Sequence, residues 1–135
     1  MAAYRDQVEF LIQNRMLPNG DYVLPGHSKV KVKRWIPVIN HFDFETTWYL
    51  FAFSSAGVTL FPMDGHGKVC GQRQILWREM TDFHIRHGLL EDTMTIRLPE
   101  ETLCMKMTCH VLGSPWVGEN RQRLMACQYG KGYAL

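Results

Sequence analysis

The feature that most constrains the fold is a long run of alternating apolar and polar residues between positions 82 and 111. In the segments 82–87, 93–98 and 102–111 every second residue is apolar, a period that indicates strands with one buried and one wet face. Gly88 lies in the first connection and Pro99 in the second, and both residue types suit turns. We therefore expect an antiparallel meander at the centre of the protein, entered through a short strand at 76–80.

Further strands are expected before this meander. Residues 29–39 alternate lysine with valine, 47–53 are apolar on both faces, and 58–61 return after a turn at Ser54-Ser55-Ala56-Gly57. The segment 21–28 contains Pro25-Gly26 and is interpreted as a loop or a frayed strand. The glycine-rich segment 62–68 lacks the Ser or Thr that follows Gly-Lys in a phosphate-binding loop, so we interpret it as a plain connection.

One helix is expected at each end of the chain. Apolar residues at helical spacing predict an amphipathic helix over 3–17, which Pro18-Asn19-Gly20 ends. Such a helix either packs on its own domain, which we favour, or binds a partner. Ser114-Pro115 suits a helix start, and the second helix should run to about Gln128 and stop at Gly130. Its expected buried side consists of Val117, Leu124, Met125 and Cys127.

The sum is an α+β, mainly β protein forming a single domain over 1–135. About seven antiparallel strands should curl into a barrel or an orthogonal sandwich, with the C-terminal helix capping one end and the N-terminal helix (1–19) as an addition. A chain of 135 residues, 46% hydrophobic and 21% charged, is long and apolar enough to bury a core.

Composition also limits the classes of partner. The net charge of +2 gives no strong attraction to nucleic acid or to an anionic membrane, and we expect contact with neither. The N-terminus lacks a signal-peptide pattern, and the longest apolar run is too short to span a bilayer. Four cysteines without a CxxC pair favour reduced thiols in a cytoplasmic protein, with no cofactor and no bound metal.

The order of elements resembles the pleckstrin-homology-like (PH-like) superfold, specifically its bacterial members. The resemblance covers about 29–129 and rests on the hairpin 48–61, the strand entry ILWREMTDF (75–83), the hairpin HGLLEDTMTI (87–96) and the terminal helix. It implies a seven-stranded barrel and a binding role without catalysis. Phosphoinositide-binding members carry basic residues on both of their first two strands, and here Lys31, Lys33 and Arg34 match only the first half of that pattern.

Two clusters are candidate sites. Lys29, Lys31, Lys33 and Arg34 give the strand at 29–39 a basic face, which suits either a small anion-binding patch or an edge strand protected against aggregation, and we favour protection. His41, Asp43 and Glu45 share one face of an extended segment and could begin a metal or pocket site. Because they span about 13 Å along a strand, a further ligand such as His66 or His84 would be needed, and we favour a solvated face.

Three functions follow from these observations. The first is a non-catalytic module that binds a protein or peptide, or forms homo-oligomers through the N-terminal helix or an edge strand. The second is a small enzyme or ligand carrier with a cone-like NTF2 fold, whose pocket would use His41, Asp43 and His84. The third is weak binding of phosphate or anionic lipid by the basic strand. We favour the first and expect no enzymatic activity.

Overall fold

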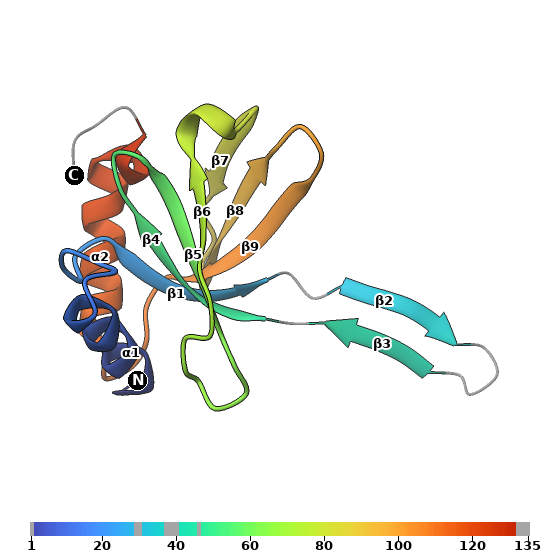
Figure 1. Ribbon diagram of the computed structural model, residues 1–135, viewed down its shortest axis with the longest axis horizontal. Helices are drawn as coiled ribbons and strands as arrows, with labels where there is room; N and C mark the ends of the chain where they lie inside the picture. The colour runs from blue at the N-terminus through green and yellow to red at the C-terminus, as the bar shows by residue number, and fades with distance from the viewer. Residues whose placement is uncertain (1, 29–30, 37–40, 46, 132–135) are drawn as a thin grey trace.

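The computed structural model describes residues 2–28, 31–36, 41–45 and 47–131, with side chains for 4–28 and 47–131. A seven-stranded antiparallel sheet in the order β6-β5-β4-β1-β9-β8-β7 carries one helix on each face, and a separate pair of strands, β2 and β3, stands apart from it (Figure 1). The helices and strands are α1 (Ala2–Gln13), β1 (Val23–Ser28), β2 (Lys31–Ile36), β3 (His41–Glu45), β4 (Trp48–Phe53), β5 (Gly57–Met63), β6 (Arg73–Leu76), β7 (Asp82–Arg86), β8 (Glu91–Arg97), β9 (Thr102–Thr108) and α2 (Pro115–Ala126).

The expected meander is confirmed as β7, β8 and β9. Phe83 pairs with Ile96 across β7 and β8, and Met94 pairs with Met105 across β8 and β9. The apolar half of the alternation points into the main core, where Met94, Ile96 and Met105 are at most 4% exposed. The strand expected at 76–80 is wrong in its bounds, because β6 ends at Leu76 and a 3₁₀ turn, η1 (Trp77–Glu79), follows it.

The central strand β1 is the main correction to the sequence analysis, which expected a loop or a frayed strand at 21–28. β1 lies between β4 and β9, and Pro25 falls where β1 pairs only with β4, so its missing N–H leaves no gap in the β9 ladder. A Cβ at Gly26 would clash with the carbonyl oxygen of Lys106 and lie 2.7 Å from the ring of Phe51. Glycine is thus required here because β9 approaches closely, and not because the chain turns.

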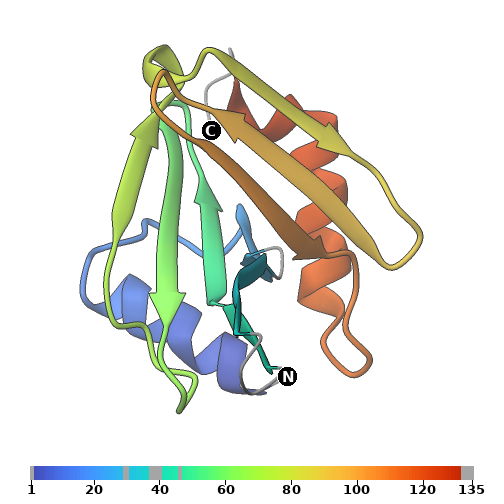
Figure 2. The same ribbon diagram turned by 90° about the vertical axis from the view of Figure 1, so that its right-hand side faces the viewer.

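The sheet is strongly curved, but in the described residues it does not close into a barrel, which was one of the two arrangements expected beside an orthogonal sandwich. β6 and β7 are its free edges, and they are joined near one end by side chains, with the rings of Trp77 and Phe83 5.0 Å apart. The two halves of the sheet face each other across the main core, which α2 covers (Figure 2). The α+β, mainly β class is confirmed. The barrel alternative is not, because β6 and β7, the two edge strands, do not pair with one another.

The helix α1 packs on the opposite face of the sheet, over β1, β4 and β5. Val8 and Leu11 are fully buried there against Leu50 and Phe61. The interpretation that this helix packs on its own domain is confirmed, although it ends at Gln13 and the buried Leu17 belongs to the loop that follows.

The helix α2 begins at Pro115, as expected, and buries Val117 and Leu124. Met125 was expected to be buried but is 37% exposed. Asn120 takes a buried place instead, because its side-chain amide donates to the carbonyl oxygens of Gly20, at 2.7 Å, and Val23, at 2.9 Å. These two bonds tie α2 to the start of the central strand.

Candidate interaction surface

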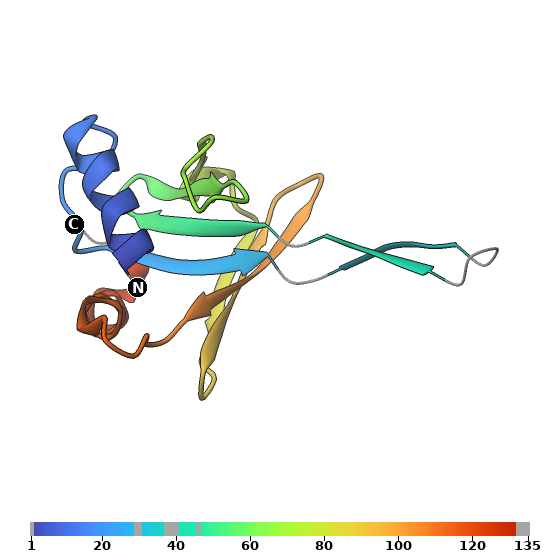
Figure 3. The same ribbon diagram turned by 90° about the horizontal axis from the view of Figure 1, so that it is seen from below.

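The strands β2 and β3 form a two-stranded ribbon, Lys31–Ile36 with His41–Glu45, that projects from the seven-stranded sheet (Figures 1 and 3). In four of its five register pairs, residues of opposite charge or two apolar residues lie across from one another. These pairs are Lys31 with Glu45, Val32 with Phe44, Arg34 with Asp43, and Trp35 with Phe42, and the fifth pairs Ile36 with His41. An isolated two-stranded ribbon is marginally stable in water. A ribbon of this composition is therefore suited to making contacts outside its own domain.

The ribbon is an insertion into a tight hairpin. Ser28 ends β1, and its N–H donates to the carbonyl oxygen of Thr47 at 2.8 Å, while the N–H of Thr47 donates to Oγ of Ser28 at 2.9 Å. The next pair along the ladder is His27 with Trp48. Two residues would suffice to connect Ser28 with Thr47, since two-residue turns are common in hairpins. The geometry of the sheet therefore allows a two-residue turn in place of residues 29–46.

The net positive charge of the protein resides in this segment. Residues 29–45 carry four basic and two acidic residues, and the rest of the chain carries eleven of each, so the excess of two equals the net charge of +2. Of the basic residues singled out in the sequence, Lys31 and Arg34 belong to register pairs of β2, and Lys33 sits at the irregularity between Val32 and Arg34. Lys29 lies outside the described residues, and the side chains of the other three lie outside the described side chains.

At the root of the ribbon, His27 connects β1 to β8. Its Nδ1 lies 2.8 Å from the carbonyl oxygen of Ser28, and its Nε2 lies 3.0 Å from Oε2 of Glu91. Both neighbours are acceptors, so the doubly protonated ring satisfies both contacts and the neutral ring only one. Trp48, 48% exposed, lies against the same ring, with the centroids 4.9 Å apart. The root is thus fixed to the sheet and presents an exposed aromatic side chain.

The expected metal or pocket residues come from different sheets. His84 is exposed on β7, where its Nδ1 lies 3.3 Å from a carboxylate oxygen of Asp82. His41, Asp43 and Glu45 belong to β3 of the ribbon, and their side chains lie outside the described side chains. Among the described residues, no three His, Cys, Asp or Glu side chains are arranged to hold a metal ion.

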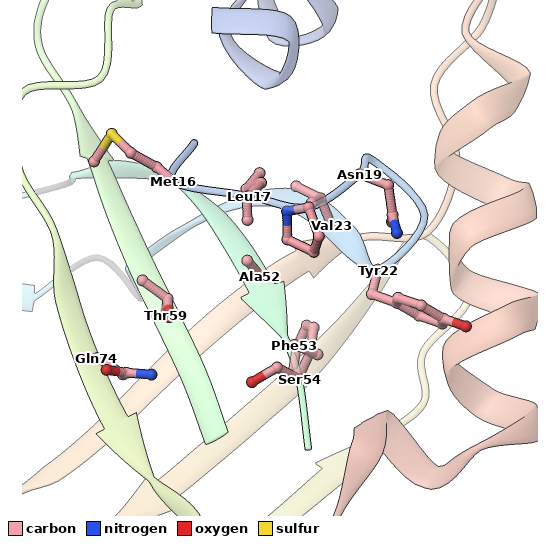
Figure 4. A pocket seen from close by; sticks show the side chains of 11 residues that line it. Met16, Leu17, Asn19, Tyr22, Val23, Ala52, Phe53, Ser54, Thr59 and Gln74 are labelled. Carbon is pink, nitrogen blue, oxygen red and sulfur yellow. The ribbon is translucent and has the colours of Figure 1, made fainter. Parts of the chain in front are cut away.

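A pocket of about 250 Å³ lies between the loop after α1 and the sheet (Figure 4). Its described lining residues include no charged side chain, and His84 is not among them. Apolar walls from Leu17, Val23 and Ala52 meet polar side chains such as Thr59 and Gln74. We call it the uncharged pocket. Its chemistry does not match the pocket with histidine and aspartate that the enzyme hypothesis requires.

A second hollow, the β6 groove, lies beside the edge strand β6. It has a volume of about 770 Å³ and is bounded by the start of β6, by η1 and by the turn between β8 and β9. Arg73 of β6 forms an ion pair with Glu101 of that turn, which joins the two walls. Its lining residues are Arg73, Arg78, Glu79, Leu98, Pro99, Glu100 and Glu101.

A buried charged cluster around Asp92 was missed by the sequence analysis. Asp92 is 1% exposed and accepts bonds from Nε and Nη2 of Arg121, at 2.8 and 3.2 Å, and from the N–H of Gly88 at 3.2 Å. Sγ of Cys109 lies 3.4 Å and Nδ1 of His87 lies 3.3 Å from the same carboxylate. The cluster ties α2 to the turn between β7 and β8. The sequence does carry a signal of this cluster. Asp92 lies two residues before Met94 and four before Ile96, so the alternation of the strand places its carboxylate on the same, core-facing side.

Electrostatics argue that this cluster is structural. Burial alone would raise the pKa of Asp92, but hydrogen bonds from Arg121, Gly88 and Cys109 outweigh burial and hold the pKa below its usual 3.8. Burial and the neighbouring carboxylate raise the pKa of Cys109 to about 11. The thiol therefore stays protonated near neutral pH and is a poor nucleophile, since the thiolate is the reactive form.

Comparisons of the chain with protein-family models, with curated proteins and with solved structures found no match. Among the described residues, no helix has both the length and the apolar character that crossing a membrane requires. The function must therefore be argued from the surfaces described above.

Proposed function

We propose that this chain is a non-catalytic interaction module of the PH-like kind and that it binds another protein through the β2–β3 ribbon. The observation that carries the proposal is the ribbon itself, which is inserted between the paired residues Ser28 and Thr47 and projects from the sheet. A segment that a two-residue turn can replace in the geometry of the sheet is free to serve another role. The likeness to PH-like domains is supported by the order of elements, in which a meander precedes a terminal helix that covers the core.

The composition of the ribbon supports a protein partner. Apolar residues face one another across its two strands, and aromatic residues such as Trp35, Phe42 and Phe44 are the types enriched at protein interfaces. Main-chain groups along the outer edges of both strands can pair with a strand of a partner. Trp48 at the root adds an exposed aromatic side chain of the main sheet.

By contrast, the free edges of the main sheet do not favour non-specific strand addition, although a strand of complementary charge can still pair with them. β6 has only four residues, and the exposed residues of β7 include Asp82, His84 and Arg86. Short and charged edge strands discourage non-specific pairing. The ribbon is therefore the favoured contact element, ahead of the N-terminal helix, whose apolar side is buried on the sheet.

Site-specific photo-crosslinking in cells that naturally produce the chain tests this function. A benzophenone amino acid replaces Trp35 in the ribbon, Phe10 on the exposed side of α1, or Gln122 on α2 as the control. We expect a protein adduct from position 35 and none from position 122. An adduct only from position 10 would move the interface to the helix, an adduct to lipid only would favour the anionic-surface hypothesis, and no adduct at any position would refute a stable protein partner.

A further inference from the structure

The free edge of β6 presents backbone groups that no described strand uses. The N–H of Trp77 donates to the carbonyl oxygen of Ala56 at 3.1 Å, in line with the register that pairs Val58 with Ile75 and Thr59 with Gln74. Hydrogen-bonded positions alternate along an antiparallel ladder. Ile75 therefore directs its N–H and C=O toward β5, and Gln74 directs its own toward the free side. The backbone N–H and C=O of Gln74 are therefore available to pair with an incoming strand.

The β6 groove lies next to Gln74, at Arg73 where β6 begins, and has a mixed charge with an excess of one carboxylate. Glu79, Glu100 and Glu101 outnumber Arg73 and Arg78 among its lining residues. Because Arg73 and Glu101 neutralise one another in their ion pair, the remaining charged lining residues are Arg78 and the two glutamates Glu79 and Glu100. The turn between β8 and β9 adds Leu98 and Pro99 as an apolar part of the wall. An extended strand that alternates basic and apolar residues suits such a groove.

The chain itself contains such a strand. In β2, lysine alternates with valine at Lys31, Val32 and Lys33, and the segment 29–45 holds the whole positive excess of the protein. Within the described residues β2 pairs with β3 on one side only, so its other side is open to a further strand. The ribbon stands away from its own sheet and can be offered to another molecule (Figures 1 and 3).

We propose that the partner of the ribbon is a second copy of this chain, whose β6 edge and β6 groove receive strand β2. The inference rests on the proposed role of the ribbon and names its partner. β2 adds to β6 beside Gln74, and its lysines complement the net negative charge of the groove. The intermolecular sheet then continues from β3 and β2 into β6 and β5 of the next copy. Such a contact joins two different surfaces, so every molecule has one donor ribbon and one acceptor groove.

Two variants remove one half of the contact each. In the donor-less variant, Asn-Gly replaces residues 29–46, which leaves Ser28 and Thr47 to close a two-residue turn. In the acceptor-less variant, Gln74→Pro removes the N–H that points away from β5, a change that edge strands tolerate. Gln74→Thr is the matched control, because it changes the same side chain but keeps the N–H. A charge-reversed ribbon, Lys31→Glu with Lys33→Glu, serves as a second donor variant that keeps the chain length.

Light scattering after size exclusion, over a range of concentrations, gives the readout. The unmodified chain and Gln74→Thr should form species larger than a monomer that dissociate between ~50 mM and ~500 mM salt, because screening weakens exposed charge contacts. Each donor or acceptor variant alone should be monomeric, with self-association weakened by about tenfold or more. The donor-less and acceptor-less variants lack one side of the strand pairing, and the charge-reversed ribbon repels the carboxylates of the groove. An equimolar mixture of the donor-less and acceptor-less variants should form a 1:1 heterodimer.

Three results would overturn this inference. The first is that the unmodified chain is monomeric at all concentrations. The second is that Gln74→Pro self-associates as strongly as the unmodified chain. The third is that an equimolar mixture of the donor-less and acceptor-less variants stays monomeric. A monomeric chain that still gives a crosslink from position 35 to another protein would refute the second copy as partner and leave the proposed function standing. A monomeric chain without any crosslink would refute both.

Discussion

Replacing Asp92 by asparagine should destabilise the protein more than any change of a surface carboxylate. Asp92 is 1% exposed, and the side chain of its main partner, Arg121, is 18% exposed. The substitution keeps the shape of the side chain but leaves a largely buried guanidinium without its counter-charge. Removing one partner of a buried ion pair costs about 3–5 kcal/mol. Because Arg121 retains some contact with water and asparagine can still accept one bond, we expect about 3 kcal/mol, the low end of that range.

The loss should depend on pH in a defined direction. The carboxyl of Asp92 has a pKa below its usual 3.8 in the folded protein, so it binds protons less readily there than in the unfolded chain. Its contribution to stability is therefore complete above about pH 4 and is lost as the pH falls through the folded pKa. The difference in unfolding free energy between Asp92→Asn and the unmodified chain should be constant near neutral pH and should shrink in strong acid.

Urea unfolding followed by tryptophan fluorescence measures these free energies. Asp82→Asn is the matched control, because Asp82 is 52% exposed and its contacts, to His84 at 3.3 Å and Arg97 at 3.9 Å, are those of a surface pair. It should cost less than about 1 kcal/mol. The double variant Asp92→Asn with Arg121→Gln should lose less than Asp92→Asn alone, since it buries no unpaired charge. A cost below about 1 kcal/mol for Asp92→Asn would refute the view that this cluster locks α2 to the β7–β8 turn.

Two further predictions concern the central strand and the thiols. Gly26→Ala places a Cβ against the carbonyl oxygen of Lys106 and should cost about 3 kcal/mol or more in urea unfolding. Gly118→Ala is the control, because the new Cβ meets no atom within 4 Å apart from the backbone of its own helix, and it should stabilise the helix by about 0.5–1 kcal/mol. Equal effects would contradict the close approach of β1 and β9. The exposed Cys70 should react readily with Ellman's reagent at pH 8. The buried Cys109, with its pKa of about 11, should react only when the protein unfolds. Similar reaction rates for both thiols would contradict the burial of Cys109.

The parts of the fold that the sequence predicts are those in which period and burial agree. β7, β8 and β9 alternate strictly and were found with nearly correct bounds, because each buries one face on the core. β1 was missed because Pro25-Gly26 is typical of a turn. In the structure neither residue marks a turn. Pro25 lies where β1 does not pair with β9, and Gly26 leaves room for the β9 backbone to approach closely.

The alternation of apolar and polar residues predicts strands, but it does not predict which strands pair with one another. Alternation at 29–39 predicted a strand, and the basic residues were located on it, but the same pattern does not say which strand is its neighbour. The ribbon therefore emerged only from the register of β2 with β3. For the same reason the link between Asp92 and Arg121, which are 29 positions apart, was not visible in the sequence.

The central claim is that the ribbon serves association and not folding, and excision of residues 29–46 tests it most directly. With Asn-Gly joining Ser28 to Thr47, the free energy of unfolding should stay the same or rise, by up to about 2 kcal/mol, because a shorter loop costs less entropy to close. The slowly exchanging backbone amides of the seven-stranded sheet should keep their protection, while association with a partner is lost. A chain that fails to fold after excision, or one that folds and still associates as before, would contradict the account.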